Sequence, residues 1–320
     1  MNKHLTELIK RRAGELGFDK VGVARAAPLR EEADLLDQWL SRGYHGTMKW
    51  MAKEPGRRAD PARVLPGAAS VIMVAMNYYV DLPHEDGPGK GKISRYAWGS
   101  DYHEIMLIPL ERLLESIVAA EPGARGKVYV DTGPVMEKAW AARAGIGWLG
   151  KHTNVITQEL GSWVFLGEII LSLDLVPDAP AVDRCGSCSL CIEACPTDAI
   201  VAPYVLDATR CISYLTIEHR GEIARELAGK FEGWIYGCDI CQDVCPWNEK
   251  FSTPTHVPGF GPRDENRSPE LGTIARMSPA EFSARYRKSP VKRTRHRGLV
   301  RNAEIVLANQ RRSQTEQTAS

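Results

Sequence analysis

All eight cysteines of the chain lie in one stretch between Cys185 and Cys245. The first four follow the spacing C-x2-C-x2-C-x3-C-P, which is the ferredoxin pattern for a [4Fe–4S] cluster. The last three follow C-x2-C-x3-C-P, and Cys211 can supply the missing first ligand from upstream. In two-cluster ferredoxins the fourth cysteine of a run binds the other cluster. We therefore assign two sets of four thiolates: Cys185, Cys188, Cys191 and Cys245 to one cluster, and Cys195, Cys211, Cys238 and Cys241 to the other.

Two other interpretations of these cysteines are weaker. Zinc sites usually show two separated C-x2-C pairs instead of a tight triple followed by C-P. Disulfide frameworks are typical of short secreted chains. Thiolates are the soft, charged ligands that iron–sulfur clusters prefer. Because each set takes one cysteine from the other half of the stretch, the two clusters are predicted to lie close together and to conduct electrons.

The composition is that of an ordinary soluble protein. The 320 residues have room for about two domains and a small appendage, with 43% hydrophobic and 25% charged residues. The net charge of +1 implies no polyanionic partner by itself. No apolar run of about 18 residues occurs, so we expect no membrane span. The first residues lack the apolar core of a signal peptide, and thiolate clusters need a reducing compartment, so the cytoplasm is expected.

The elements that must position these groups are predicted from periodicity and turn residues. Helices and strands alternate ahead of the cysteines, which predicts an α/β domain with a mixed sheet. The predicted helices cover 5–16, 31–40, 102–120 and 135–144, and the predicted strands cover 20–24, 70–76, 127–130 and 155–173, the last broken by glycines.

Three domains follow from this pattern. Pro177-Asp-Ala-Pro180 marks a boundary, so residues 1–178 form the α/β domain and 179–250 form a ferredoxin-like double-cluster domain. Residues 251–320 form a linker and basic helices. A capped helix is predicted to start at Ser278, a second helix covers 298–309, and the polar end from Arg311 is predicted to fray.

Asp131 is the strongest candidate for acid chemistry outside the cysteines. It lies where a predicted strand ends, and functional groups gather at such ends in α/β sheets. A carboxylic acid there can donate a proton if burial raises its pKa. The alternative, a helix N-cap or a turn-forming aspartate, stays open on position alone.

Two further segments combine polar groups with aromatic residues or glycines. Arg95-Tyr-Ala-Trp-Gly-Ser-Asp-Tyr-His103 can line a large planar ligand, or it can be a turn whose Ser100 or Asp101 caps a helix. Asp101-x-His103 begins like the corrinoid pattern D-x-H-x-x-G, but Met106 replaces the glycine, so His103 is a poor candidate for a lower cobalt ligand. The glycines of Gly145-Ile-Gly-Trp-Leu-Gly150 allow close approach of the following residues to a ligand, and the spacing is not that of a nucleotide-binding loop.

Residues 285–301 hold eight Lys or Arg and no Asp or Glu. Such a run is usually a solvated helix face, but a polyanion would gain counterion release from it. Both interpretations stay open on composition. The candidate nucleic-acid contacts are Lys292, Arg293, Arg295, Arg297 and Arg301.

With these pieces placed, the chain resembles the epoxyqueuosine reductase family from about residue 5 to residue 309. The most specific parts are the 95–103 segment, Asp131-Thr-Gly-Pro134, Gly145-Ile-Gly-Trp-Leu-Gly-Lys-His-Thr-Asn154, and the cysteines with Pro246-Trp-Asn248. The resemblance implies a nitroreductase-like corrinoid domain, the double-cluster domain, and a C-terminus with about one pair of HEAT-like helices.

The resemblance also implies a function. Enzymes of this family reduce the epoxide of epoxyqueuosine at the tRNA wobble position to queuosine, with cobalamin and two [4Fe–4S] clusters. It implies that Asp131 donates a proton, that reduced ferredoxin or flavodoxin supplies electrons, and that the protein is a monomer. The implied cobalamin contacts are Arg58, Tyr96, Asp131, Thr153, Asn154, Ser213, Cys238, Asp239, Ile240 and Cys241. The alternative is a corrinoid and iron–sulfur reductive dehalogenase, which typically carries a twin-arginine signal that we do not find here.

Overall fold

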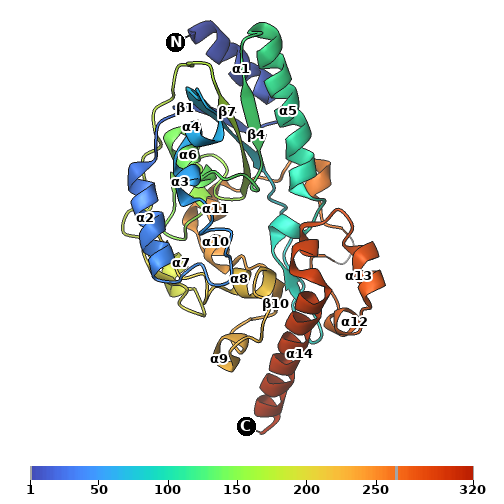
Figure 1. Cartoon of the computed structure of the whole chain (residues 1–320). Helices are drawn as coiled ribbons and strands as arrows, with labels where there is room; N and C mark the ends of the chain where they lie inside the picture. The colour runs from blue at the N-terminus through green and yellow to red at the C-terminus, as the bar shows by residue number, and fades with distance from the viewer. Residues whose placement is uncertain (1, 264–265, 320) are drawn as a thin grey trace.

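The computed structural model describes residues 2–263 and 266–319. A sheet with its flanking helices forms one end of the molecule, and the short helices of the cysteine segment and the C-terminal helix form the other (Figure 1). Within the described residues, no helix is both long enough and apolar enough to cross a bilayer.

The central sheet has four strands in the order β1 (Lys20–Arg25), β2 (Ser70–Asn77), β7 (Val164–Leu171) and β4 (Gly126–Tyr129). All three pairings are antiparallel. The prediction of a mixed sheet is therefore wrong for this sheet. Alternation of helices and strands suggested parallel crossovers, but strand order depends on long-range pairing that alternation does not reveal.

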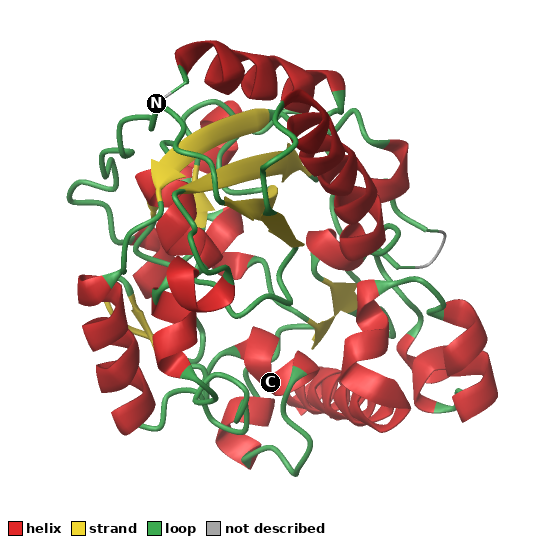
Figure 2. Cartoon of the chain, turned by 45° about the horizontal axis from the view of Figure 1, so that its top comes forward, coloured by secondary structure: helices red, strands yellow, loops and turns green. Residues whose placement is uncertain are grey.

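Helices cover both faces of this sheet (Figure 2). On one face, α1 (Lys3–Glu15) and α5 (Tyr102–Ala120) pack in the largest core cluster. On the other, α6 (Glu137–Arg143) packs against β2 through Trp140 and Ala141. Gly22 allows the end of α6 to approach, since a Cβ there would lie 1.9 Å from the Ala144 carbonyl oxygen. The site loops thus stand on a sheet that is packed on both sides.

The remaining elements of this part are short. They include α2 (Arg30–Ser41), α3 (Pro55–Ala59), α4 (Pro61–Val64), and the paired strands β5 (Trp148–Leu149) and β6 (Val155–Ile156). The predicted strand-like run 155–173 is therefore two strands, β6 and β7, separated near Gly161. The other predicted helices and strands of this part are confirmed to within a few residues.

The cysteine segment consists of helices of four to six residues and one hairpin. They are α7 (Leu190–Glu193), β8 (Ile200–Ala202), β9 (Val205–Leu206), α8 (Ile212–Ile217), α9 (Arg225–Ala228), α10 (Ile240–Asp243) and α11 (Pro246–Phe251). Helices this short are marginal alone. Their cysteines must therefore be positioned by contacts with the rest of the molecule.

A second core joins three distant parts of the chain. Strand β3 (Lys92–Ile93) pairs in parallel with β10 (Trp234–Tyr236), and η1 (Arg95–Ala97) follows β3. Buried residues of these elements pack with the C-terminal helices. The predicted domain limits at 178 and 250 stay predictions, and residues 92–98 share a core with the two later segments.

The C-terminal part comprises η2 (Pro258–Phe260), α12 (Leu271–Ala275), α13 (Pro279–Arg285), η3 (Pro290–Thr294) and α14 (Arg295–Ala319). The predicted capped helix start is confirmed, because Ser278 and Glu281 form a capping box on α13. The predicted fraying after Arg311 is wrong, since α14 continues as one helix through that polar segment. Its inner face is anchored by Leu299, Ala303 and Val306, which are buried.

Candidate active site and cluster centre

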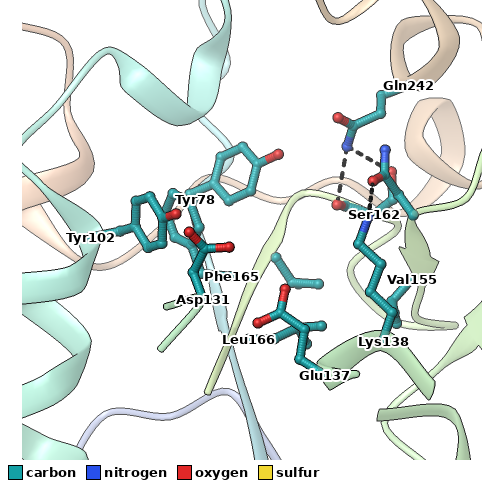
Figure 3. A pocket seen from close by; sticks show the side chains of 12 residues that line it. Tyr78, Tyr102, Asp131, Glu137, Lys138, Val155, Ser162, Phe165, Leu166 and Gln242 are labelled. Carbon is teal, nitrogen blue, oxygen red and sulfur yellow. Dashed lines mark hydrogen bonds between the residues drawn. The ribbon is translucent and has the colours of Figure 1, made fainter. Parts of the chain in front are cut away.

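A pocket of about 110 Å³, open at its mouth, lies between the central sheet and the cysteine segment. Its walls come from β2, α5, the loop after β4, α6, β6, β7 and α10, and Figure 3 shows Asp131 and Tyr102 facing Glu137 and Lys138 across it. The polar lining residues are Tyr78, Tyr102, Asp131, Glu137, Lys138, Asn154, Ser162 and Gln242. Because Gln242 directly follows Cys241, one pocket reaches from the predicted acid to the predicted cluster ligands.

Asp131 stands on a strained turn at the end of β4. Its φ of 58° lies in the left-handed region, which non-glycine residues adopt only when the surrounding structure enforces it. Its side chain is 54% exposed, but that exposure is toward the pocket. Asp131 thus lies in the pocket wall, and its role there stays a prediction.

The protonation state of Asp131 differs from the one that the sequence argument required. Burial in the pocket would raise the pKa of Asp131, but the hydrogen bond and positive charge of His103, followed by Tyr102 and Lys138, outweigh it and lower the pKa. His103 Nε2 lies 3.3 Å from Asp131 Oδ2. In this structure Asp131 is therefore an ionised carboxylate that accepts from His103. It is not a carboxylic acid kept protonated by burial.

His103 is held between two carboxylates. Its Nδ1 lies 2.6 Å from Asp101 Oδ1, and Asp101 also caps α5 by accepting from the His103 N–H. Burial lowers the pKa of His103, but hydrogen bonds to Asp101 and Asp131 and the negative charge of both raise it to about 9. His103 is therefore protonated at neutral pH and donates from both ring nitrogens. The predicted helix cap at Asp101 is confirmed.

Glu137 and Lys138 form the opposite wall. Burial and the nearby charge of Asp131 raise the pKa of Glu137 to about 7. Lys138 Nζ donates to the Thr153 carbonyl and to Asn154 Oδ1, both at 3.0 Å. One lysine thus holds two of the predicted cofactor contacts at the pocket.

The eight thiols are all free and divide into two neighbourhoods. The Cys191 thiol interacts electrostatically with Cys185, Cys188 and Cys245. In the other neighbourhood, Cys211 interacts with Cys195. Cys241 interacts with both Cys211 and Cys195. Cys238 interacts with Cys241 and Cys211. Cys241 also interacts electrostatically with Cys191, so the two neighbourhoods lie next to each other. The assignment of these thiols to two crossed ligand sets stays a prediction.

Both thiol sets are largely shielded from solvent. Cys191 and Cys245 are buried, and the other six thiols are half-buried. Burial raises the pKa of Cys211, Cys238 and Cys241, and also that of Cys191 and Cys245, above the ordinary thiol value. Cys185 and Cys188 are half-buried beside the exposed residues Gly186 and Ser187. No three His, Cys, Asp or Glu side chains in the described ranges converge as tightly as one metal ion would need, and a four-iron cluster spreads its thiolates more widely than one ion does.

Two of the predicted cofactor contacts lie where the cysteine segment meets the rest of the chain. The Ser213 N–H donates to the Cys211 thiol. The Asp239 side chain is completely buried and accepts from the Ser94 hydroxyl and from the Arg95 N–H. That carboxylate is therefore engaged by Ser94 and Arg95 inside the protein.

Unpaired buried nitrogens support a large ligand near α3. Arg58 Nε, Arg57 Nε and His45 Nδ1 are buried and have no hydrogen-bond partner among the residues that the structure describes. Their segment is tied to α8 by Tyr214, whose hydroxyl accepts from the Thr47 N–H at 2.7 Å. Buried nitrogens normally find a partner, so a ligand rich in carbonyl and phosphate groups, such as cobalamin, fits the residues present.

The predicted contact Tyr96 also lies beside the pocket. Its hydroxyl donates to the Tyr236 hydroxyl at 3.0 Å. Burial and then the charges of neighbouring residues, Asp131 among them, raise its pKa well above the ordinary tyrosine value. Tyr96 is therefore a neutral phenol within electrostatic reach of the acid.

The basic segment does not present all of its side chains alike. Lys292, Arg293, Arg295 and Arg297 are exposed on η3 and the start of α14. Arg293 pairs with Glu218 at 2.7 Å. Arg301 instead donates to the carbonyl oxygens of Leu215, His219 and Gly221. Arg301 is thus engaged inside the protein, in contrast to its predicted role.

Sequence reasoning missed several residues of the pocket. Glu137 and Lys138 belonged to a predicted helix, and Ser162 and Gln242 to a strand-like run and a cysteine turn. Their relation is tertiary: Gln242 Nε2 donates to Ser162 Oγ at 2.9 Å across 80 residues. The one available signal was a charged pair, Glu137-Lys138, inside a mostly apolar helix.

Two family models match the chain. A "4Fe-4S double cluster binding domain" covers residues 184–248, and "Epoxyqueuosine reductase QueG, DUF1730" covers residues 58–132. The first contains every cysteine, and the second ends just past Asp131. The fold and site therefore define an iron–sulfur oxidoreductase with two clusters.

Similar proteins of known name identify the family within this class of iron–sulfur oxidoreductases. Epoxyqueuosine reductase of Gloeobacter violaceus is 48% identical over 93% of this chain and 94% of its own length, and that of Cellulophaga algicola is 44% identical over 95% and 98%. A crystal structure of epoxyqueuosine reductase with an epoxyqueuosine-modified tRNA-Tyr stem loop superimposes with a TM-score of 0.89 at 33% identity, covering 96% of this chain and 82% of that one. The chain belongs to the epoxyqueuosine reductase family.

Proposed function

We propose that this protein reduces the epoxide of epoxyqueuosine in tRNA to the alkene of queuosine. The observation that carries the proposal is the single pocket that joins Asp131 to the helix bearing Cys241. An acid that can protonate a departing oxygen and a route for electrons thus meet at one place. The dehalogenase alternative finds only a weak counterpart, since one catabolic reductive dehalogenase is 16% identical.

The residues present would suit two kinds of cofactor. Each four-thiol set would hold one [4Fe–4S] cluster, and the unpaired nitrogens near α3, with Tyr96, Thr153, Asn154, Ser213 and the 238–241 turn, would hold cobalamin. Bound cobalamin supplies low-valent cobalt, which performs the difficult redox chemistry at carbon. The chain orients the substrate, excludes water and delivers protons through Asp131.

Electrons would enter at the thiol set that contains Cys185 and Cys188. These two thiols lie beside the exposed residues Gly186 and Ser187, whereas Cys241 directly precedes Gln242 of the pocket wall. A reduced ferredoxin or flavodoxin would therefore dock near Cys185. We further infer that the protein acts as a cytoplasmic monomer, that its first domain is nitroreductase-like, and that α13 and α14 form a HEAT-like pair.

The exposed basic residues would hold the tRNA. Bases of an anticodon loop are single-stranded and can be splayed into a pocket. Lys292, Arg293, Arg295 and Arg297 would contact phosphates, which position the nucleic acid without reading its sequence. Arg301 is left out of this contact set because its donors are used inside the protein.

The test is the Asp131→Asn variant. With clusters and cobalamin bound, we expect its rate of queuosine formation on epoxyqueuosine-containing tRNA to fall by about 10²–10⁴-fold, the range for a positioned acid. The Asp37→Asn variant, altered at an exposed position on α2, serves as the matched control. If Asp131→Asn keeps the wild-type rate, the proposed role of Asp131 in proton delivery is rejected. If the wild-type protein shows no turnover, the proposed function is rejected.

A further inference from the structure

Three side chains form a continuous hydrogen-bonded line from the start of α5 to the pocket. Asp101 Oδ1 lies 2.6 Å from His103 Nδ1, and His103 Nε2 lies 3.3 Å from Asp131 Oδ2. The sequence singled out Asp101 as a candidate helix cap and Asp101-x-His103 as an incomplete corrinoid motif. The structure gives this pair a different partner, the acid itself.

The proposed reaction needs more protons than one carboxyl carries. Converting an epoxide to an alkene breaks two C–O bonds, forms one C=C π bond, and releases the oxygen as water. Two electrons, from a one-electron carrier protein through the clusters, and two protons are consumed. Asp131 holds at most one proton, so it must be reloaded before the oxygen can leave as water.

The neighbourhood of His103 places a mobile proton beside Asp131. The pKa of Asp131 is lowered and that of His103 is raised to about 9, so the shared proton rests on His103. The charged groups that face this imidazole are Asp101, Asp131 and, across the pocket, Glu137. Its side chain is 33% exposed, so lost protons can be replaced from water.

We propose that Asp101, His103 and Asp131 form a proton relay, an inference that rests on the proposed function. His103 Nε2 transfers its proton to Asp131 Oδ2, and Asp131 delivers it to the substrate oxygen. The neutral imidazole keeps its remaining proton on Nδ1, where Asp101 accepts the hydrogen bond. Nε2 then regains a proton from solvent, and the cycle supplies the second proton. His103 and Asp101 act through Asp131 and are positioning residues.

Variants of His103 in the cofactor-loaded enzyme test the relay. We expect His103→Gln, which keeps hydrogen-bonding groups but carries no transferable proton, to form queuosine about 10²-fold more slowly. The wild-type rate should fall as pH rises through about 9, and His103→Gln should lack this fall. Added imidazole should partly restore the rate of His103→Ala. His256→Gln, which alters a His–Asp pair at Asp19 away from the pocket, is the matched control.

A second measurement is independent of turnover. The ¹⁵N resonances of His103 should titrate near pH 9 in the wild type and at lower pH in Asp101→Asn and Asp131→Asn, because each variant loses a negative charge. Titration of His103 in the ordinary histidine range overturns the relay whether or not the enzyme turns over. The relay is also overturned if His103→Ala is slow and added imidazole does not raise its rate. It is overturned as well if His103→Gln keeps the wild-type rate and pH profile. A wild type that titrates as expected but leaves epoxyqueuosine unchanged rejects only the proposed function.

Discussion

At the scale of single residues, the pocket is governed by which carboxyls are charged. Asp131 is ionised because His103 stabilises its negative charge, whereas Glu137 on the opposite wall is partly protonated at neutral pH. A third carboxyl, Glu168 on β7, is 1% exposed, and its Oε2 has no hydrogen-bond partner within the described part of the chain. Burial, followed by the charges of Glu137 and Asp131, raises the pKa of Glu168 well above the ordinary value. Three neighbouring acids therefore hold different protonation states.

Glu168 makes a prediction about stability. Because its folded pKa lies above the unfolded value of about 4.3, the folded state binds more protons above that pH, and stability falls as pH rises. As the pH rises, we expect the free energy of unfolding of Glu168→Gln to exceed that of the wild type by ~1.4 kcal/mol for each unit by which the pKa of Glu168 is raised. Urea denaturation of the cluster-loaded protein between pH 5 and 8 measures this. Equal pH dependence in both proteins would contradict it, and Glu111→Gln, on the exposed face of α5, is the control.

At the scale of elements, α14 has two functions on two faces. Its inner face carries Asn302, which is completely buried and donates to the carbonyl oxygens of Thr216 and Ile235. Arg301 adds bonds to the loop after α8. The helix therefore fastens α8, beside Cys211, to the second core, while the exposed arginines at its start face solvent.

Arg301→Ala is expected to affect folding and not tRNA contact. Loss of charge-assisted bonds to three backbone carbonyls should lower the free energy of unfolding by about 2–3 kcal/mol. The urea midpoint should fall, while tRNA affinity of the folded fraction stays at the wild-type value. An Arg301→Ala protein of unchanged stability would show that these bonds contribute little.

Arg297→Ala should behave in the opposite way. This side chain is exposed, so its removal should leave the urea midpoint unchanged. Removing one phosphate contact should weaken tRNA binding and make the slope of log affinity against log salt shallower by about 0.7–0.9. Binding titrations at several salt concentrations measure the slope, and an unchanged slope would exclude Arg297 from the tRNA surface.

At the scale of the whole molecule, the cysteine segment lies between two packed cores. Asn248 on α11 shows the link: its Oδ1 accepts from the Ser162 N–H at 2.6 Å, and its Nδ2 donates to the Gln242 carbonyl at 2.7 Å. Hydrogen bonds of Asn248 thus link the sheet region to the pocket wall and to the second half of the cysteine segment. These bonds hold the loop before β7 against α10, which carries Cys241.

Crossed ligation makes a prediction at this scale. Cys245 lies 60 residues after Cys185, yet both belong to the same set. Cys245→Ala and Cys185→Ala should each lose about half of the iron and sulfide and leave the same remaining cluster signal. Cys195→Ala should leave the other signal. Iron analysis and electron paramagnetic resonance of the reduced proteins check this, and a Cys245→Ala spectrum that matches Cys195→Ala would reverse the assignment.

The sequence by itself determined what depends on short spacing. The cysteine pattern predicts two crossed clusters because ligand spacing is local chemistry. The cap at Ser278 follows from neighbours within three residues, whereas the sequence left the choice between Ser100 and Asp101 as the cap of α5 open. Apolar periodicity predicted α1, α5, β2 and the end of β4, and so placed Asp131 at a strand end.

Only the tertiary structure decided which distant groups meet. It made the central sheet antiparallel, turned Arg301 inward, and brought His103 to Asp131 across 28 residues. That last contact reversed the expected protonation state of Asp131, because a pKa depends on the charges packed around a group and not on its neighbours in the chain. A local pattern specifies how a segment folds, but the partner of a buried or charged group is fixed by packing between segments.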